Sequence, residues 1–206
     1  MFIRTEKHTF ASTKVINLRK ITIVSLNNLC YGKESCSISS QSGQRIRFVP
    51  VSGKFFENGI PYKVFAVSDT REIKTNSGIT LFADDVIANL KGHEDEFDAL
   101  VFACGDAVPV FKDNAGKAYN VDLMEVIKAF GEKGKLMIGH CAAAMMFNFT
   151  GITAGKRLAV HPLAKPAIQT GQATDGKSEI DDNFYTAQDE NTLWTMMPQL
   201  IEALKK

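Results

Sequence analysis

The stretch "LMIGHCAAAMMFNF", residues 136–149, decides the fold and indicates a site. Its first four residues are short and apolar, which is typical of a buried strand. Residues 142–149 favour a helix and are almost entirely apolar. Cys141 stands between the two, beside Gly139 and a run of alanines. Small neighbours allow a sharp strand-to-helix turn, and such a turn pushes a nucleophilic side chain toward substrate.

Two interpretations of Cys141 remain open from this stretch alone. A thiol at the start of a helix has its thiolate stabilised by the partial positive charge there, so its pKa would fall. Free cysteine is also among the most buried residue types and often packs as a small apolar side chain. The rest of the chain has to decide between a nucleophile and a core residue.

Strands and helices alternate along most of the chain. "DALVFACG" (98–105) is an apolar strand, and "NVDLMEVIKAFGEKGK" (120–135) has the apolar period of a helix that closes at Gly131 or Gly134. This order predicts an α/β fold, with a mainly parallel central sheet covered by helices on both faces. Further strands are predicted at 20–26, 62–68, 156–162 and 183–188, and a terminal helix at 190–206 with a kink at Pro198.

Two regions carry weaker signals. Residues 78–92 suggest a short strand that runs into a helix capped near Asp84 or Asp85. Residues 27–53 are rich in serine, glycine, asparagine and glutamine without a helical period, so we interpret them as a long loop. We expect an N-terminal extension over 1–18 and one domain over 19–206.

Composition limits the classes of function. The chain has 206 residues, 45% of them hydrophobic, and a formal net charge of +1, which favours neither nucleic acid nor an anionic membrane surface. No apolar stretch approaches the ~20 residues of a membrane-spanning helix. The first twenty residues lack the apolar segment of a secretory signal, so a cytoplasmic location is expected. We interpret all four cysteines as thiols, because the spacing of Cys30, Cys36, Cys104 and Cys141 matches no zinc pattern.

In parallel sheets, sites form beyond the carboxyl ends of the strands. His161 ends the strand "RLAVH" and could serve as a base or as a cation beside the thiolate. Backbone amides at Gly105 and Asp106, where another strand ends, could stabilise an oxyanion. His140 adjoins Cys141, but neighbouring strand residues point to opposite faces, so it is a possible neighbour of the site more than its base.

Three segments together resemble the ThiJ/PfpI superfamily, in this order: "DALVFACGD", "KGKLMIGHCAAAMMF" and "GKRLAVHPLAKPAI". The closing "NFYTAQDENTLWTMMPQLIEAL" fits the branch of Parkinson-associated deglycase-like proteins, and the resemblance covers roughly residues 60–206. It implies a flavodoxin-like three-layer sandwich of the class I glutamine amidotransferase-like kind, and a homodimer. It also implies that no metal or organic cofactor is needed.

The resemblance assigns roles to particular residues. Cys141 stands at the nucleophile-elbow cysteine and His161 at the histidine near it. Gly105 and Asp106 stand at the turn whose amides face the cysteine, and we count the amide of Ala142 with them. The family also places a protonated glutamate after the first strand, where it donates a hydrogen bond to the thiolate. Glu34 is the candidate for that glutamate.

The sequence departs from the family in two places. Ala142 follows the nucleophile, where the protease-like branch has a histidine, which weakens the case for a peptidase triad. The helix expected after Glu34 is hard to find in residues 36–53, so either this segment diverges or the gene is read differently there.

Three functions follow. The first is a cysteine-dependent enzyme, either an amidase or peptidase or a glyoxalase or deglycase, acting on a small-molecule or peptide substrate. In that enzyme His161 transfers the proton. The alternatives are a non-catalytic redox sensor or stress-response chaperone, and a degenerate member that acts only as a binding domain.

Overall fold

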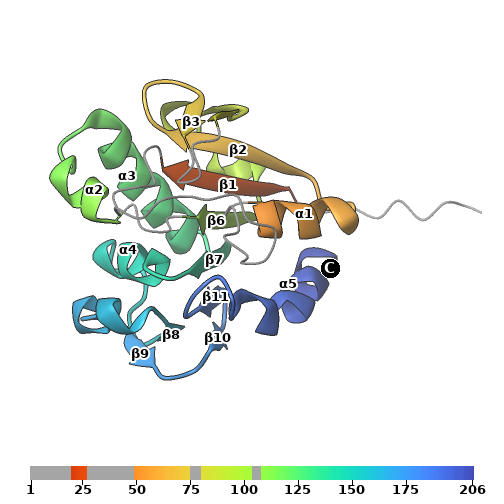
Figure 1. The fold of residues 1–206 in the computed structure, drawn as a ribbon, viewed down its shortest axis with the longest axis vertical. Helices are drawn as coiled ribbons and strands as arrows, with labels where there is room; N and C mark the ends of the chain where they lie inside the picture. Colours follow the sequence, from red (N-terminus) through yellow and green to blue (C-terminus); the bar gives the residue numbers. More distant parts are fainter. Residues whose placement is uncertain (1–19, 27–48, 75–79, 104–107) are drawn as a thin grey trace, which may run out of the picture.

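The computed structural model describes residues 20–26, 49–74, 80–103 and 108–206. Its centre is a seven-stranded sheet with the order β10-β11-β7-β6-β1-β2-β5 (Figure 1). Every neighbouring pair is parallel except β10 and β11, which confirms the predicted α/β fold with a mainly parallel sheet. The strands are β1 (Ile21–Leu26), β2 (Tyr62–Val67), β5 (Asp85–Val86), β6 (Ala99–Ala103), β7 (Leu136–His140), β10 (Ser178–Asp181) and β11 (Phe184–Ala187).

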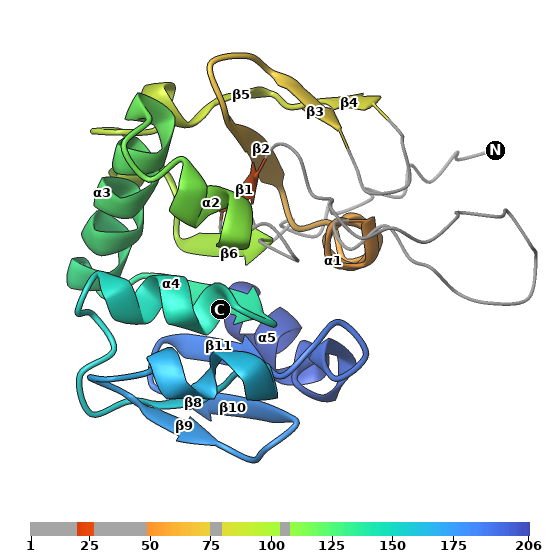
Figure 2. The same cartoon turned by 60° about the vertical axis from the view of Figure 1, so that its left-hand side comes forward.

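Helices cover both faces of this sheet (Figures 1 and 2). One face packs against α3 (Ala118–Glu132) and α4 (Ala143–Phe149), and the other against α1 (Val49–Glu57) and α5 (Met197–Leu204). The side chains of successive strand residues point to opposite faces of the sheet. Met137 therefore joins the α3–α4 core, and Ile138 joins the α1–α5 core. Both side chains are fully buried, so β7 is enclosed on both sides.

Two small sheets lie outside the central one. β3 (Glu72–Lys74) pairs antiparallel with β4 (Thr80–Phe82), and β8 (Arg157–Ala159) pairs in parallel with β9 (Gln172–Thr174). The strand predicted at 156–162 is therefore β8, and it belongs to a two-stranded sheet. The Thr186 hydroxyl accepts a hydrogen bond of 2.9 Å from the Ala159 N–H and fastens β8 to β11.

Three local predictions needed correction. Residues 49–53 are the start of α1, because Val51 and Phe55 pack into the core although serine and glycine lie between them. In the region 78–92, β4 is the predicted short strand, but β5 and the 3₁₀ turn η1 (Ile87–Asn89) stand where an α-helix was expected. The Asp85 carboxylate there accepts from the Val86 N–H and the Asn89 amide, which favours a tight turn.

The third correction concerns the start of the terminal helix. Pro198 stands in the first turn of α5, after the 3₁₀ turn η5 (Leu193–Thr195), so it helps to begin that helix and does not kink it. Of the two glycines predicted to close the preceding helix α3, Gly134 does so, since with φ of 65° it takes the left-handed position just after α3. Gly131 lies inside α3, where a Cβ would meet Ile152 at 2.5 Å. A short helix α2 (Val108–Asp113) precedes α3.

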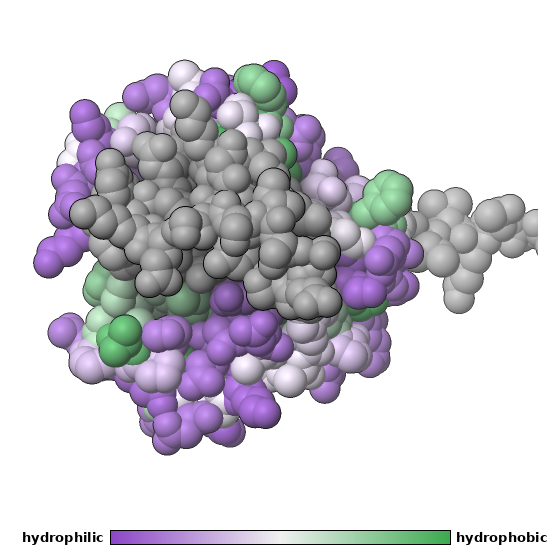
Figure 3. All heavy atoms as spheres, viewed as in Figure 1, coloured by the Kyte–Doolittle hydropathy of each residue, from purple (hydrophilic) through white to green (hydrophobic). Residues whose placement is uncertain are grey.

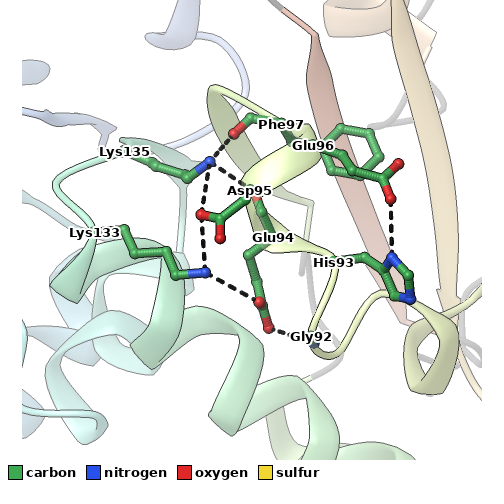
Figure 4. A network of polar contacts seen from close by, with 8 residues as sticks. All are labelled: Gly92, His93, Glu94, Asp95, Glu96, Phe97, Lys133 and Lys135. Carbon is green, nitrogen blue, oxygen red and sulfur yellow. Dashed lines mark hydrogen bonds and ion pairs between the residues drawn. The ribbon is translucent and has the colours of Figure 1, made fainter.

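A polar network holds the amino-terminal end of β7, opposite the predicted site (Figure 4). Lys135 donates to the carbonyl groups of Glu94 and Phe97, and Lys133 donates to Glu94 at 3.4 Å. The Glu94 carboxylate is largely buried and also accepts from the Gly92 N–H at 2.9 Å. Because Leu136 follows Lys135 directly, the network anchors β7 beside the chain that leads into β6.

The Glu94 carboxylate should make folding stability depend on pH. Burial alone would raise the pKa of Glu94, but hydrogen bonds from backbone N–H groups and from Lys133 outweigh it and lower the pKa below 4.5. A lowered folded-state pKa adds stability above the unfolded value, and that stability is lost as the pH falls through the folded-state pKa. Glu94→Ala should therefore cost about 1–3 kcal/mol of unfolding free energy at pH 7 and progressively less below pH ~4.5.

Urea unfolding of both proteins at several pH values measures this difference. Glu57→Ala, which removes an exposed ion pair with Lys54, is the matched control and should cost little at any pH. A constant deficit for Glu94→Ala across the pH range would contradict the role assigned to the charge.

Candidate functional site

Cys141 has the left-handed backbone of a tight strand-to-helix elbow. Its φ is 59°, in the left-handed region that residues with a side chain rarely occupy. Its N–H donates to the carbonyl of Ala187 at 3.1 Å, one step beyond the last register pair of β7 and β11. Its carbonyl accepts from the N–H of His161 at 3.0 Å. Cys141 is therefore fixed on both sides at the carboxyl end of a central strand.

The elbow closes tightly because Gly139 has no side chain. A Cβ at this position would meet the Cβ of Ala143 at 2.5 Å and the ring of Phe147 at 3.2 Å. Helix α4 can therefore lie directly against the end of β7, where it begins two residues after Cys141. The Ala142 carbonyl accepts from the N–H groups of Met145 and Met146 and so starts the helix.

The thiol of Cys141 lies at the edge of the core. Cys141 is partly exposed, while Ala143 and Ala144 beside it are buried. Figure 3 shows apolar surface on the side where Figure 1 places α4, with polar surface over the small sheet below. Phe149 and Leu163 are large apolar residues exposed on α4 and the turn after His161.

His161 precedes the 3₁₀ helix η4 (Pro162–Ala167) and caps it. Its Nδ1 accepts a hydrogen bond of 3.3 Å from the N–H of Leu163. A nitrogen that accepts a hydrogen bond carries no proton, so this contact assigns the neutral imidazole the tautomer with its N–H at Nε2. The structure thus brings the His161 backbone against the elbow and leaves Nε2 as the donor of the ring.

His140 is enclosed in the protein. It is only 3% exposed, and strand alternation puts it on the same face as Ile138, away from the Gly139 and α4 side. Its backbone is in register with Ala187 of β11. His140 is thus a core residue next to the elbow.

Three predicted site residues, Glu34, Gly105 and Asp106, lie outside the described part of the chain. So do Cys30, Cys36 and Cys104, which were interpreted only as thiols. Ala142 is described and forms the half-buried turn between β7 and α4. Among the described residues no group of three or more histidine, cysteine, aspartate or glutamate side chains could hold a metal ion. No helix in that part of the chain is long and apolar enough to cross a membrane.

One polar residue that the sequence reasoning did not single out is central to this region. Asn148 in the last turn of α4 is 5% exposed, and its amide bonds to the segment that follows η4. The available signal was its position, since Asn148 is the one polar residue in the run 142–149.

The described residues thus define an α/β protein with a mainly parallel sheet and a cysteine on a strand-to-helix elbow at the carboxyl end of a central strand. Comparison with known families agrees, since the model of the DJ-1/PfpI family matches residues 46–203. The chain belongs to the DJ-1/PfpI family.

Two similar proteins come from Bacteroides thetaiotaomicron. The chain is 81% identical to "Protein ppBat" of that organism over 151 residues, which are 73% of this chain and 86% of that protein. A crystal structure of a protein from the same species, named "putative protease I", matches with a TM-score of 0.81 and 66% identity, covering 90% of this chain and 99% of that one.

A more distant structure shares the fold. DJ-1 from Toxoplasma gondii matches with a TM-score of 0.70 at 18% identity, over 90% of each chain. This likeness confirms the predicted flavodoxin-like sandwich.

Filling the space at Gly139 should disturb the elbow. Gly139→Ala places a methyl group where Ala143 and Phe147 already lie, so it should cost about 1–3 kcal/mol of unfolding free energy, as overpacked cores do. Urea unfolding measures this cost. Gly116→Ala is the control, because a Cβ there meets nothing within 4 Å and should change stability little. Equal stability of both variants would show that α4 does not depend on the gap at Gly139.

Proposed function

We propose that this chain is a cysteine-dependent enzyme in which Cys141 attacks an electrophilic carbonyl carbon, with amide or peptide hydrolysis as its first candidate reaction. The observation that carries the proposal is the left-handed backbone of Cys141, held by hydrogen bonds from two neighbouring segments while the residue stays partly exposed. Strain of this kind costs roughly 1–2 kcal/mol and persists only where the surroundings impose it, often at active sites.

The proposed reaction has two steps. The Cys141 thiolate forms a C–S bond with the carbonyl carbon, and the carbonyl electron pair moves to oxygen. Collapse of this adduct breaks the C–N bond, and the amine leaves with a proton from the site or from solvent. Water then hydrolyses the thioester, which releases the acid and restores the thiol.

The similarity to "putative protease I" supports amides as substrates. The alanine at position 142 weighs against a triad with a histidine directly after the nucleophile. Small reactive aldehydes, the substrates of a glyoxalase or deglycase, share the first step, since a thiolate adds to them in the same way. The assay therefore has to include both substrate classes.

Replacing Cys141 tests the proposal. We expect the wild type to hydrolyse members of a fluorogenic peptide panel or to consume methylglyoxal, and Cys141→Ala and Cys141→Ser to fall to the background rate in both assays. Cleavage of peptides alone supports the amidase, and loss of methylglyoxal alone supports the glyoxalase or deglycase. Activity that survives in both variants contradicts a cysteine nucleophile.

The same proteins test the alternative of a redox sensor, which the partial exposure of Cys141 favours. Exposed thiolates oxidise readily to sulfenic and sulfinic acids. If neither substrate class is turned over, while intact mass shows selective oxygen addition at Cys141 under mild peroxide, the sensor replaces the enzyme.

We assign His161 the role of a hydrogen-bond donor through Nε2, because its Nδ1 already accepts from Leu163. The donated bond would stabilise negative charge on sulfur or on the oxyanion. This assignment differs from the proton transfer expected from the sequence, because a ring that moves a proton would have to give up the bond to Leu163 or turn.

Two substitutions separate these roles. His161→Ala should slow alkylation of Cys141 by iodoacetamide about tenfold to a hundredfold, as the loss of a hydrogen bond to a charged group does. His161→Gln keeps an N–H donor near the Nε2 position and should stay within about threefold of wild type by the same reasoning. His93→Ala removes an exposed histidine that contacts Glu96 and is the control. A Gln variant as slow as the Ala variant would restore the proton-transfer role.

A further inference from the structure

The amide of Asn148 joins the elbow helix to the segment behind His161. Its side-chain oxygen accepts from three successive backbone N–H groups, at 3.0–3.3 Å, and from two threonine hydroxyls. Its Nδ2 donates to a backbone carbonyl of the same segment at 3.2 Å. The three N–H groups belong to Gln169, Thr170 and Gly171, the hydroxyls to Thr153 and Thr170, and the carbonyl to Ala167.

These bonds complete a closed path through the site. Helix α4 runs from the Cys141 elbow to Asn148, and Asn148 holds residues 167–171. The chain leads back from there through η4 to His161, whose N–H donates to the Cys141 carbonyl at 3.0 Å. The segment 161–171 is thus bound at its start to Cys141 and at its end to Asn148 in the last turn of α4.

Between these two contacts, η4 is held mainly by polar bonds, among them the ion pair of the Lys165 ammonium with the Asp175 carboxylate. None of its residues is buried, and Ala164 and Ile168 pack only partly against the core. Pro162 and Pro166 have no backbone N–H to donate. The position of η4 therefore depends on polar bonds more than on apolar packing, and Asn148 supplies most of those at residues 167–171.

We propose that Asn148 is a positioning residue of the site, which acts through η4 to hold His161 in place beside Cys141. The inference rests on the proposed cysteine chemistry, because it assigns Asn148 a part in the reactivity of that thiol. Asn148 lies seven residues along the chain from Cys141, about 10 Å at the rise of a helix, so it does not touch the reacting atoms itself.

A double-mutant cycle separates positioning from mere stability. Iodoacetamide alkylation of Cys141 is measured in the wild type, His161→Ala, Asn148→Ala and the double variant. If Asn148 positions His161, removal of His161 slows the wild type about tenfold or more but slows the Asn148→Ala background less than about twofold. Asn183→Ala is the control, since its amide donates to the Lys135 carbonyl at the other end of β7. An undiminished His161 effect in the Asn148→Ala background overturns the proposal.

Hydrogen exchange gives a second readout that does not need a reactive thiol. Asn148→Ala should speed exchange of the His161 amide and of residues 169–171 about tenfold or more, while amides of β7 keep their protection. Asn148→Asp keeps the acceptor oxygen and remains usable if the alanine variant does not fold. It should leave exchange of residues 169–171 within about threefold of wild type.

The two readouts separate failure of this inference from failure of the proposed function. A wild-type thiol that reacts no faster than the unfolded chain, with or without His161, contradicts the cysteine chemistry. The exchange of the His161 amide then still decides the positioning role. Unchanged exchange at His161 in Asn148→Ala contradicts the inference whatever the thiol does.

Discussion

The structure of the site depends on two backbone hydrogen bonds at one residue. The Cys141 N–H donates to the carbonyl of Ala187, and the Cys141 carbonyl accepts from the N–H of His161. The peptide groups before and after its Cα are therefore both fixed. A left-handed backbone at a residue with a side chain costs roughly 1–2 kcal/mol. Two hydrogen bonds that contribute about 0.5–1.5 kcal/mol each offset a cost of that size. The conformation is thus maintained by β11 and by the segment after β8.

The position of β7 in the sheet makes this arrangement possible. β7 lies between β6 and β11 and is buried on both faces, so its carboxyl end moves little relative to its neighbours. The polar network around Glu94 anchors the opposite end of the same strand. Gly139 then allows α4 to lie against the end of β7. The strand β7, the helix α4 and the turn at His161 therefore meet at Cys141.

The sequence was sufficient for the elements whose pattern and packing agree. β7 and α4 have uniform apolar runs on either side of Cys141, and both were predicted within two residues. Helix α1 was missed because its serine and glycine have low helix propensity, and only burial of Val51 and Phe55 against the sheet reveals why it forms. The helix predicted after Asp84 or Asp85 is absent for a different reason, since local side-chain bonds of Asp85 favour a 3₁₀ turn there.

The sequence could predict which single residues belong to the candidate site, but it could not predict the tertiary contacts between them. A lone cysteine between small residues indicates an elbow, and a histidine before a proline indicates a strand end. The sequence does not show that β8 lies outside the central sheet, because pairing partners are set by tertiary contacts. Asn148 illustrates the same limit. In the sequence, one asparagine in an apolar helix is weak evidence of a role. In the structure, its amide is almost fully buried and accepts from three successive N–H groups. These bonds are the reason that the segment after His161 keeps its place near the elbow.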